Sequence, residues 1–419
     1  MTLLSNMLRI RENISSDSYR TLWALLFCLS LSTIFMTDNL RIHRNVYYLL
    51  VLPLFFLQVP VSFFYSLFRS PVFLASLAFL GYLWVSFFWS TASGALNFYN
   101  ETRSLILMLI FLAIIAFYSL VVDNFSRLLA KCLACVVGIT ALVSVYAFYI
   151  SNQIPITEWL THRAWDIGIT ARHIGHSSGL YGAVAVFLIF GLVTCGRQGK
   201  IRKSEGGRQE GKGESPDMWM WIGAVALVPV LGFVFLTQTR GALLGIVTVL
   251  GLGVLAQGDR RLFLMSAVSA GALLAVVAMR SSMSDARLEI WSLALDRAWE
   301  RPWFGFGLNE IQGLVVASGY NHDTAHNMFL DCLQYGGLVG LLLLLGLIVL
   351  ALRGAWREYR RTGSFLLFAI VLYPLIFGFF DSFLTLSRVS PMWFQFWLPV
   401  GLVIGSEIRA RREEHAGKI

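Results

Sequence analysis

The sequence predicts an all-α polytopic membrane protein with about twelve transmembrane helices and one helical segment outside the bilayer. Composition is the first reason. Hydrophobic residues make up 57% of the 419 residues, charged residues make up 14%, and the mean hydropathy is +0.68. Soluble domains do not show this balance. The second reason is that long apolar runs recur along the chain, each near the length that a helix needs to cross a bilayer.

The apolar runs divide the chain into three parts. Spans one to nine fill residues 1–279 and include a polar cytoplasmic linker at 196–217. Residues 280–326 form an outer, periplasmic segment with an amphipathic helix, and residues 327–419 hold the last three spans and a cytoplasmic tail. The expected spans are 22–37, 47–67, 72–91, 104–122, 128–150, 178–195, 218–236, 242–256, 262–279, 327–352, 364–379 and 391–408.

The distribution of positive charge indicates the orientation. Most of the 33 lysine and arginine residues fall in segments that share a side with the N-terminus, which assigns both termini to the cytoplasm. This bias also explains the net charge of +9, so no nucleic-acid partner is indicated.

Neither a metal site nor a cofactor is expected. Cys132 and Cys135 lie in an apolar run without a second pair, which favours helix packing over a zinc site or a disulfide framework. Three histidines in the outer loop at 151–177 match no compact ligand motif. A solvated loop, or a polar lining for an anionic substrate to which Arg172 contributes, is favoured instead.

Arg240 lies in a connection of a few polar residues between two apolar runs. So short a connection keeps its side chain near the membrane surface. Two interpretations carry equal weight at this point: the guanidinium snorkels toward lipid headgroups, or it binds a phosphate.

The outer segment contains an amphipathic helix that can lie on the bilayer. Its apolar face is made by Leu288, Trp291, Leu295 and Trp299. Ser284 or Asp285 is expected to cap its start and Pro302 to end it. Arg287 then falls in the first turn, where free backbone N–H groups already favour an anion.

His326 is expected at the mouth of the next transmembrane helix, with Asp323 or Thr324 capping the first turn. Polar residues follow at helical spacing: Asn327, Asp331 and Gln334. Because a carboxylate or amide facing lipid is costly, this polar stripe should face a cavity or another helix.

Two arginines and a histidine on the outer side suggest group transfer from an anionic donor. The guanidinium groups of Arg240 and Arg287 can hold phosphate oxygens and neutralise a departing diphosphate. His326 can take the proton of an acceptor hydroxyl. The sequence has no Asp-x-Asp for a bridging divalent cation, so arginine is expected to do that neutralising.

Three short motifs resemble those of the O-antigen ligase and polymerase superfamily. The first is His326-Asn327 followed by Gly337 and Gly340, and the second is Thr237 to Ala242. The third is the series Arg287, Trp291, Pro302, Gly305 and Gly307.

The resemblance implies a metal-independent glycosyltransferase of the GT-C type. Such an enzyme would move a polysaccharide from undecaprenyl diphosphate to the lipid A–core oligosaccharide, at the periplasmic face of the bacterial inner membrane, with inversion of the anomeric carbon. His326 matches the histidine proposed as the base, and Arg240 and Arg287 match the arginines thought to bind the diphosphate. Substrate-binding roles are expected for Gln238, Trp291 and Asn327, and a supporting role for His322.

Alternatives remain. An O-antigen polymerase uses the same chemistry with a lipid-linked chain as acceptor, and a protein O-oligosaccharyltransferase uses a protein side chain. The pattern of one dominant outer loop favours the ligase. A lipid-linked sugar transporter or flippase would predict related halves, and residues 1–195 and 218–409 show no convincing repeat.

Overall fold

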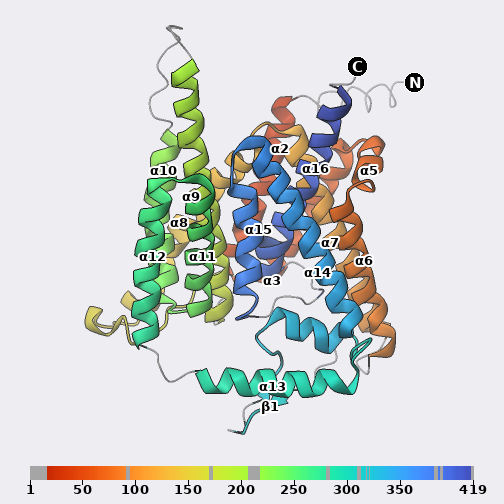
Figure 1. Ribbon diagram of the computed structural model, residues 1–419, viewed down its shortest axis with the longest axis vertical. Coiled ribbons are helices and arrows are strands. Elements are labelled where there is room, and N and C mark those ends of the chain that lie inside the picture. Colours follow the sequence, from red (N-terminus) through yellow and green to blue (C-terminus); the bar gives the residue numbers. More distant parts are fainter. Residues whose placement is uncertain are drawn as a thin grey trace.

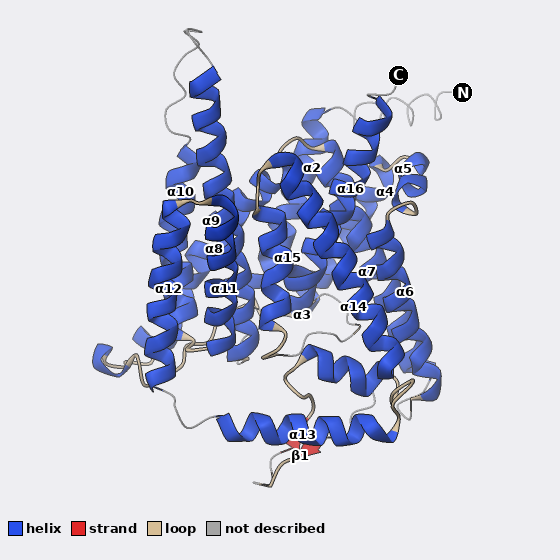
Figure 2. Ribbon diagram, in the orientation of Figure 1, coloured by secondary structure: helices blue, strands red, loops and turns tan. Residues whose placement is uncertain are grey.

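The computed structural model describes residues 17–90, 95–168, 173–205, 218–279, 284–308, 313–317, 319, 321–381, 386 and 390–416 (Figure 1). Helices dominate these residues, and the two short strands β1 (Leu314–Val315) and β2 (Asn321–His322) pair antiparallel (Figure 2). The all-α prediction is confirmed.

The helices follow one another with short connections. The first part of the chain forms α2 (Asp17–Ser32), η1 (Thr33–Phe35), α3 (Leu40–Val46), η2 (Tyr47–Val51), α4 (Leu52–Gln58), α5 (Val61–Leu67), α6 (Pro71–Ser86), η3 (Phe87–Trp89), α7 (Ala95–Val121), α8 (Phe125–Val145), η4 (Tyr146–Ile150) and η5 (Ile156–Glu158). The second part forms α9 (Ile174–Glu205), α10 (Met218–Leu236), α11 (Arg240–Gln257), α12 (Arg260–Met279), α13 (Ser284–Glu300), α14 (Met328–Thr362), α15 (Leu366–Phe377), η7 (Trp393–Trp397) and α16 (Leu398–Ala416).

Among the described residues, eight helices are long and apolar enough to cross a membrane, or nine if the bent pair Arg41–Gln58 and Val61–Leu67 is one span. That pair is bent by 96°, next to Pro60, because the residue before a proline is held out of the helical conformation. Two expected spans are shorter apolar helices, Tyr19–Phe35 and Leu366–Phe377. A polytopic membrane protein is confirmed, while the count of twelve spans stays a prediction.

The bundle has two different ends. The described chain begins in α2 and ends in α16 at one end, and α13 lies across the other end, roughly perpendicular to the long helices (Figure 1). The end that holds α13 is called the outer end below, and the end that holds the last turns of α16 the inner end. Exposed apolar side chains such as Leu49, Val228 and Leu255 lie on the membrane-crossing part, as expected of helices that face lipid.

Helix α14 is broken where the sequence predicts a continuous helix. Gly337 has φ 61° and ψ −165°, a conformation that L side chains rarely adopt. The turn that follows α13 docks into the break: the amide of Leu338 donates to the carbonyl of Pro302 at 2.7 Å, and that of Phe306 donates to the carbonyl of Gln334 at 2.9 Å. The first turns of α14 are thereby separated from its long membrane-crossing part.

A small separate core lies between α13 and the start of α14. Its buried members are Ile290, Ala294, Leu314, Val316 and Ala325. On the other side of α13, Leu288, Leu295 and Trp299 are exposed, as expected for a helix that lies on a bilayer. Trp291, expected on that same face, instead packs against the small core.

Candidate functional site

The backbone that carries His326 is held by side chains from two helices. The amide of Ala325 donates to Asp331 Oδ1 at 2.8 Å, and its carbonyl accepts from Trp291 Nε1 at 3.1 Å. His326 itself has φ 49°, an uncommon conformation for a residue other than glycine. Since both polar groups of the preceding residue are bonded, the imidazole is placed by α13 and α14 together.

Asn327 begins α14 and caps it. Its Oδ1 accepts from the amides of Phe329 at 3.0 Å and Leu330 at 3.3 Å. The expectation that Asp323 or Thr324 caps this helix is therefore wrong, because the helix starts later than expected and Asn327 occupies the N-cap position. The polar stripe of Asn327, Asp331 and Gln334 is buried, as its composition predicts.

A buried carboxylate lies between two histidines. Asp381 Oδ1 is 3.3 Å from His176 Nε2 and 3.8 Å from His326 Nδ1. The Asp381 side chain is 6% exposed, whereas both imidazoles are 43% exposed. The carboxylate is thus withdrawn from solvent behind two rings that a substrate can reach.

Arg240 and Arg287 come from different helices and are close enough for their charges to interact, and Arg287 also lies near Asp381. Burial lowers the pKa of the Arg287 guanidinium, the charge of Asp381 raises it, and the charge of Arg240 lowers it again. Arg287 also lies 6.0 Å from the ring centroid of Phe380. The start of α11 packs closely against the same residue. A Cβ built on Gly241 would be 2.6 Å from the Phe380 Cβ.

The two arginines provide positive charge that this part of the protein does not neutralise completely. Arg240 Nη2 is buried and makes no hydrogen bond within the described part of the chain. Over the same residues, no carboxylate lies within ion-pair distance, 4.0 Å, of either guanidinium. A buried guanidinium nitrogen without a partner is costly, so this arrangement favours an anionic ligand.

The predicted trio of Arg240, Arg287 and His326 is therefore brought together at the outer end, around Phe380 and Asp381. His322, in β2, lies beside this group, because its ring centroid is 5.7 Å from that of His326. Arg172 lies outside the described residues.

Three residues expected to bind substrate contact the protein's own backbone. Trp291 and Asn327 bond to the chain around His326 as described above. Gln238, which is buried and has φ 51°, donates from Nε2 to the carbonyl of Leu160 at 2.7 Å and so connects the start of α11 to the preceding outer loop. These contacts give the three side chains positioning roles, and direct substrate contact by them stays a prediction.

Asp381 and His176 were not predicted as central residues. Sequence analysis did not single out Asp381, and His176 is one of the three histidines of the loop at 151–177. His176 precedes the expected span 178–195 and Asp381 follows the expected span 364–379, and this position beside an apolar run is the signal that could have selected them. Across the described ranges, no group of three potential metal ligands is found, and metal independence stays a prediction.

Comparison with known proteins gives two matches. Residues 224–345 match the model of the protein family described as O-Antigen ligase. The chain is also 26% identical over 387 residues to an O-antigen ligase of Pseudomonas aeruginosa, an alignment that covers 89% of this chain and 87% of that protein. The family match includes Arg240, Arg287 and His326, so the residues that carry the site lie within the matched region.

Proposed function

This chain is an O-antigen ligase-type membrane enzyme of the glycosyltransferase kind, and we propose that it transfers O-antigen polysaccharide from undecaprenyl diphosphate to the lipid A–core oligosaccharide. The observation that carries this proposal is the convergence of Arg240, Arg287 and His326 near one buried carboxylate. We place the reaction at the periplasmic face of the inner membrane. The location of α13 and of the α16 terminus at opposite ends of the bundle supports this orientation (Figure 1).

The arginines hold the diphosphate of the donor. Two guanidinium groups can bind several phosphate oxygens at once, and they stabilise the negative charge that grows as the bond between the sugar and the diphosphate breaks. The buried, unpartnered Nη2 of Arg240 supports this role, because a phosphate oxygen would supply its missing acceptor. No side-chain rearrangement is needed to create positive charge at this place.

His326 acts as the general base. The acceptor hydroxyl oxygen forms a bond to the anomeric carbon, the carbon–oxygen bond to the diphosphate breaks, and the hydroxyl proton passes to His326. Since Asp381 lies on the Nδ1 side of the ring, Nε2 is the nitrogen left to receive that proton. Asp381 then stabilises the imidazolium that forms. Attack from the face opposite the diphosphate inverts the anomeric carbon.

The test is a reconstituted reaction. Purified protein is mixed with undecaprenyl-diphosphate polysaccharide and rough lipopolysaccharide in the presence of a chelator. We expect the lipopolysaccharide to shift to a ladder on a gel. Longer lipid-linked chains with unchanged lipopolysaccharide would indicate a polymerase instead. Movement of the donor across a vesicle membrane without a new glycosidic bond would indicate a transporter and overturn the proposal.

A further inference from the structure

A cavity of about 230 Å³ lies at the inner end of the bundle, far from the site described above. Residues from α7, α8, α9, α10, α14, α15 and α16 line it. At about 30 Å³ for a water molecule, the cavity has room for roughly seven or eight waters, enough for a phosphate group and a few carbon atoms. The catalytic proposal gives this cavity no role.

The cavity lies at the depth where lipid headgroups are expected. Ser119 and Thr194 line it, and they are close to the inner ends of the candidate spans Phe98–Val121 and Ile174–Gly196. Arg127, another lining residue, is in the first turn of α8. A ligand held here would thus have its polar group at the membrane surface and any acyl chain alongside the helices.

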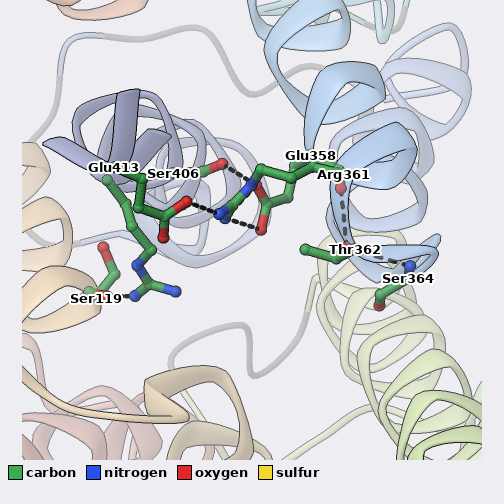
Figure 3. Close-up of polar contacts among 8 residues, drawn as sticks. Ser119, Glu358, Arg361, Thr362, Ser364, Ser406 and Glu413 are labelled. Carbon is green, nitrogen blue, oxygen red and sulfur yellow. Dashed lines mark hydrogen bonds and ion pairs between the residues drawn. The ribbon is translucent and has the colours of Figure 1, made fainter. Parts of the chain in front are cut away.

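The charge of the lining favours an anion. Its charged residues are Arg127, Arg409 and Glu358. Glu358 is neutralised by Arg361, whose guanidinium donates to both carboxylate oxygens at 2.9 and 3.0 Å (Figure 3). The two arginines that line the cavity therefore outweigh its one carboxylate.

The Glu358 carboxylate also helps to hold the wall of the cavity in place. Ser406 Oγ donates to Glu358 Oε2 at 2.8 Å, and Arg361 is also paired with Glu413, so the last turns of α14 are joined to α16 (Figure 3). Arg409 donates to the backbone carbonyl of Ser119 on α7. Three helices thus hold this side of the cavity in one arrangement.

The remaining lining combines hydroxyl groups with an apolar side. Hydroxyl groups come from Ser119, Ser126, Thr194, Thr362, Ser364 and Ser406. Leu366, Ile370 and Leu402 provide apolar surface. Arg127 Nη2 donates to Cys195 Sγ at 3.3 Å, and a sulfur is a weaker acceptor than a phosphate oxygen. Cations, hydroxyls and aliphatic side chains together suit a phosphate ester that carries a hydrocarbon chain.

We propose that this inner-end cavity binds the phosphate headgroup of an anionic phospholipid, with its acyl chains along the apolar side. Arg127 and Arg409 contact the phosphate. Most of the lining hydroxyl groups already donate within the protein, so their oxygens accept hydrogen bonds from the hydroxyl groups of a glycerol headgroup. The site is independent of the sugar-transfer reaction at the outer end.

The experiment uses the full chain in lipid nanodiscs. Wild-type protein is compared in neutral phosphatidylcholine and in mixtures containing phosphatidylglycerol, and phospholipid retained after transfer to detergent is counted by native mass spectrometry. Wild type should retain phosphatidylglycerol selectively and unfold at a higher temperature when it is present. Arg127→Gln should weaken retention about tenfold, the effect of losing one charge-assisted contact. Arg409→Lys keeps the charge and loses only the planar fork, so it should weaken retention by a smaller factor.

The matched control is Arg360→Gln, which removes an exposed arginine at the same end without touching the cavity. It should retain phosphatidylglycerol as wild type does. Equal retention by wild type and both cavity variants would overturn the proposal. The last measurement is the unfolding temperature of the wild-type protein in neutral lipid with inorganic phosphate added. If phosphate alone gives the full thermal shift and phosphatidylglycerol adds nothing, the ligand is a free anion and the lipid assignment is wrong.

Discussion

The arginines at the two ends of the bundle differ in their ion-pair partners. At the inner end, Arg361 donates three hydrogen bonds to Glu358 and is also paired with Glu413. At the outer end, the described residues offer Arg240 and Arg287 no ion pair, although Asp381 lies near enough to influence Arg287. Paired charges connect helices, whereas charges left without a close partner are available to a ligand. The comparison therefore separates Arg361, which joins two helices, from Arg240 and Arg287, which we propose bind the donor.

The largest effect should come from His326→Ala. Loss of a general base lowers the rate by about 10²- to 10⁴-fold, so transfer of polysaccharide to lipopolysaccharide should fall by that factor with the protein still folded. The measurement is the initial rate of ladder formation. His415→Ala, at the exposed inner end, is the control and should keep the wild-type rate. Wild-type transfer by the His326 variant would exclude the base role.

The next effect should come from exchanging each outer arginine for lysine. Arg240→Lys and Arg287→Lys keep the charge but lose the planar fork, and removal of one transition-state donor costs about 10²- to 10³-fold in kcat. Rates with saturating donor measure this directly. Arg360→Lys makes the same chemical change at the inner end and should have no effect. Near-normal rates in both outer variants would remove the diphosphate clamp from the mechanism.

Asp381→Asn should have a smaller effect, which lowers kcat and does not raise KM for the donor. The attraction between opposite charges about 4 Å apart contributes about 1–4 kcal/mol, so losing the carboxylate 3.8 Å from His326 should lower kcat roughly 10- to 100-fold. Removing a negative charge near Arg287 should not weaken donor binding, so KM for the donor should stay the same or fall. Glu413→Gln serves as the inner-end control. A raised KM with unchanged kcat would show that Asp381 acts on the donor instead.

The same contrast explains which features the sequence could predict. Arg240 and His326 each lie next to the end of an apolar run, and Arg287 lies in the segment that joins two such runs. The alternation of spans was therefore enough to place all three on one side. Asp381 and His176 meet His326 only because α9, α14 and α15 pack together, and hydropathy carries no information about which helices are neighbours. Sequence reasoning therefore placed the two arginines and His326 on one side and missed the buried carboxylate between the histidines.

The break in α14 was missed for another reason. A long apolar run predicts one straight helix, and although Gly337 belongs to a motif, hydropathy does not mark it as the position of a break. Its role depends on the turn after α13, which approaches so closely that a Cβ at Gly337 would be 2.4 Å from the Trp303 carbonyl carbon. The motif residues Pro302, Gly305 and Gly337 thus form one joint, although they are distant in sequence.

Gly337→Ala tests this joint. A methyl group there meets the Trp303 backbone, and the positive φ adds strain, so the free energy of unfolding should fall by about 1–3 kcal/mol. Thermal unfolding in detergent measures the loss, and the transfer rate should fall with it because the first turns of α14 carry His326. The control is Gly346→Ala in the same helix, where a Cβ would have nothing within 4 Å. That variant should be neutral or slightly more stable, and equal stability of the two variants would contradict the joint.

The smallest effect should come from Trp291→Phe, which keeps the aromatic ring in the small core and removes the indole N–H. The lost bond to the buried Ala325 carbonyl contributes about 0.5–1.5 kcal/mol, so His326 loses part of its positioning and kcat should fall several-fold. Trp299→Phe makes the same exchange on the same helix at a side chain that is 76% exposed, and it should retain the wild-type kcat. The kinetic constants distinguish the two roles available to Trp291. A lower kcat with unchanged KM supports positioning through the Ala325 backbone, whereas a raised KM with unchanged kcat would mean that the indole contacts substrate directly, as the sequence alone suggested.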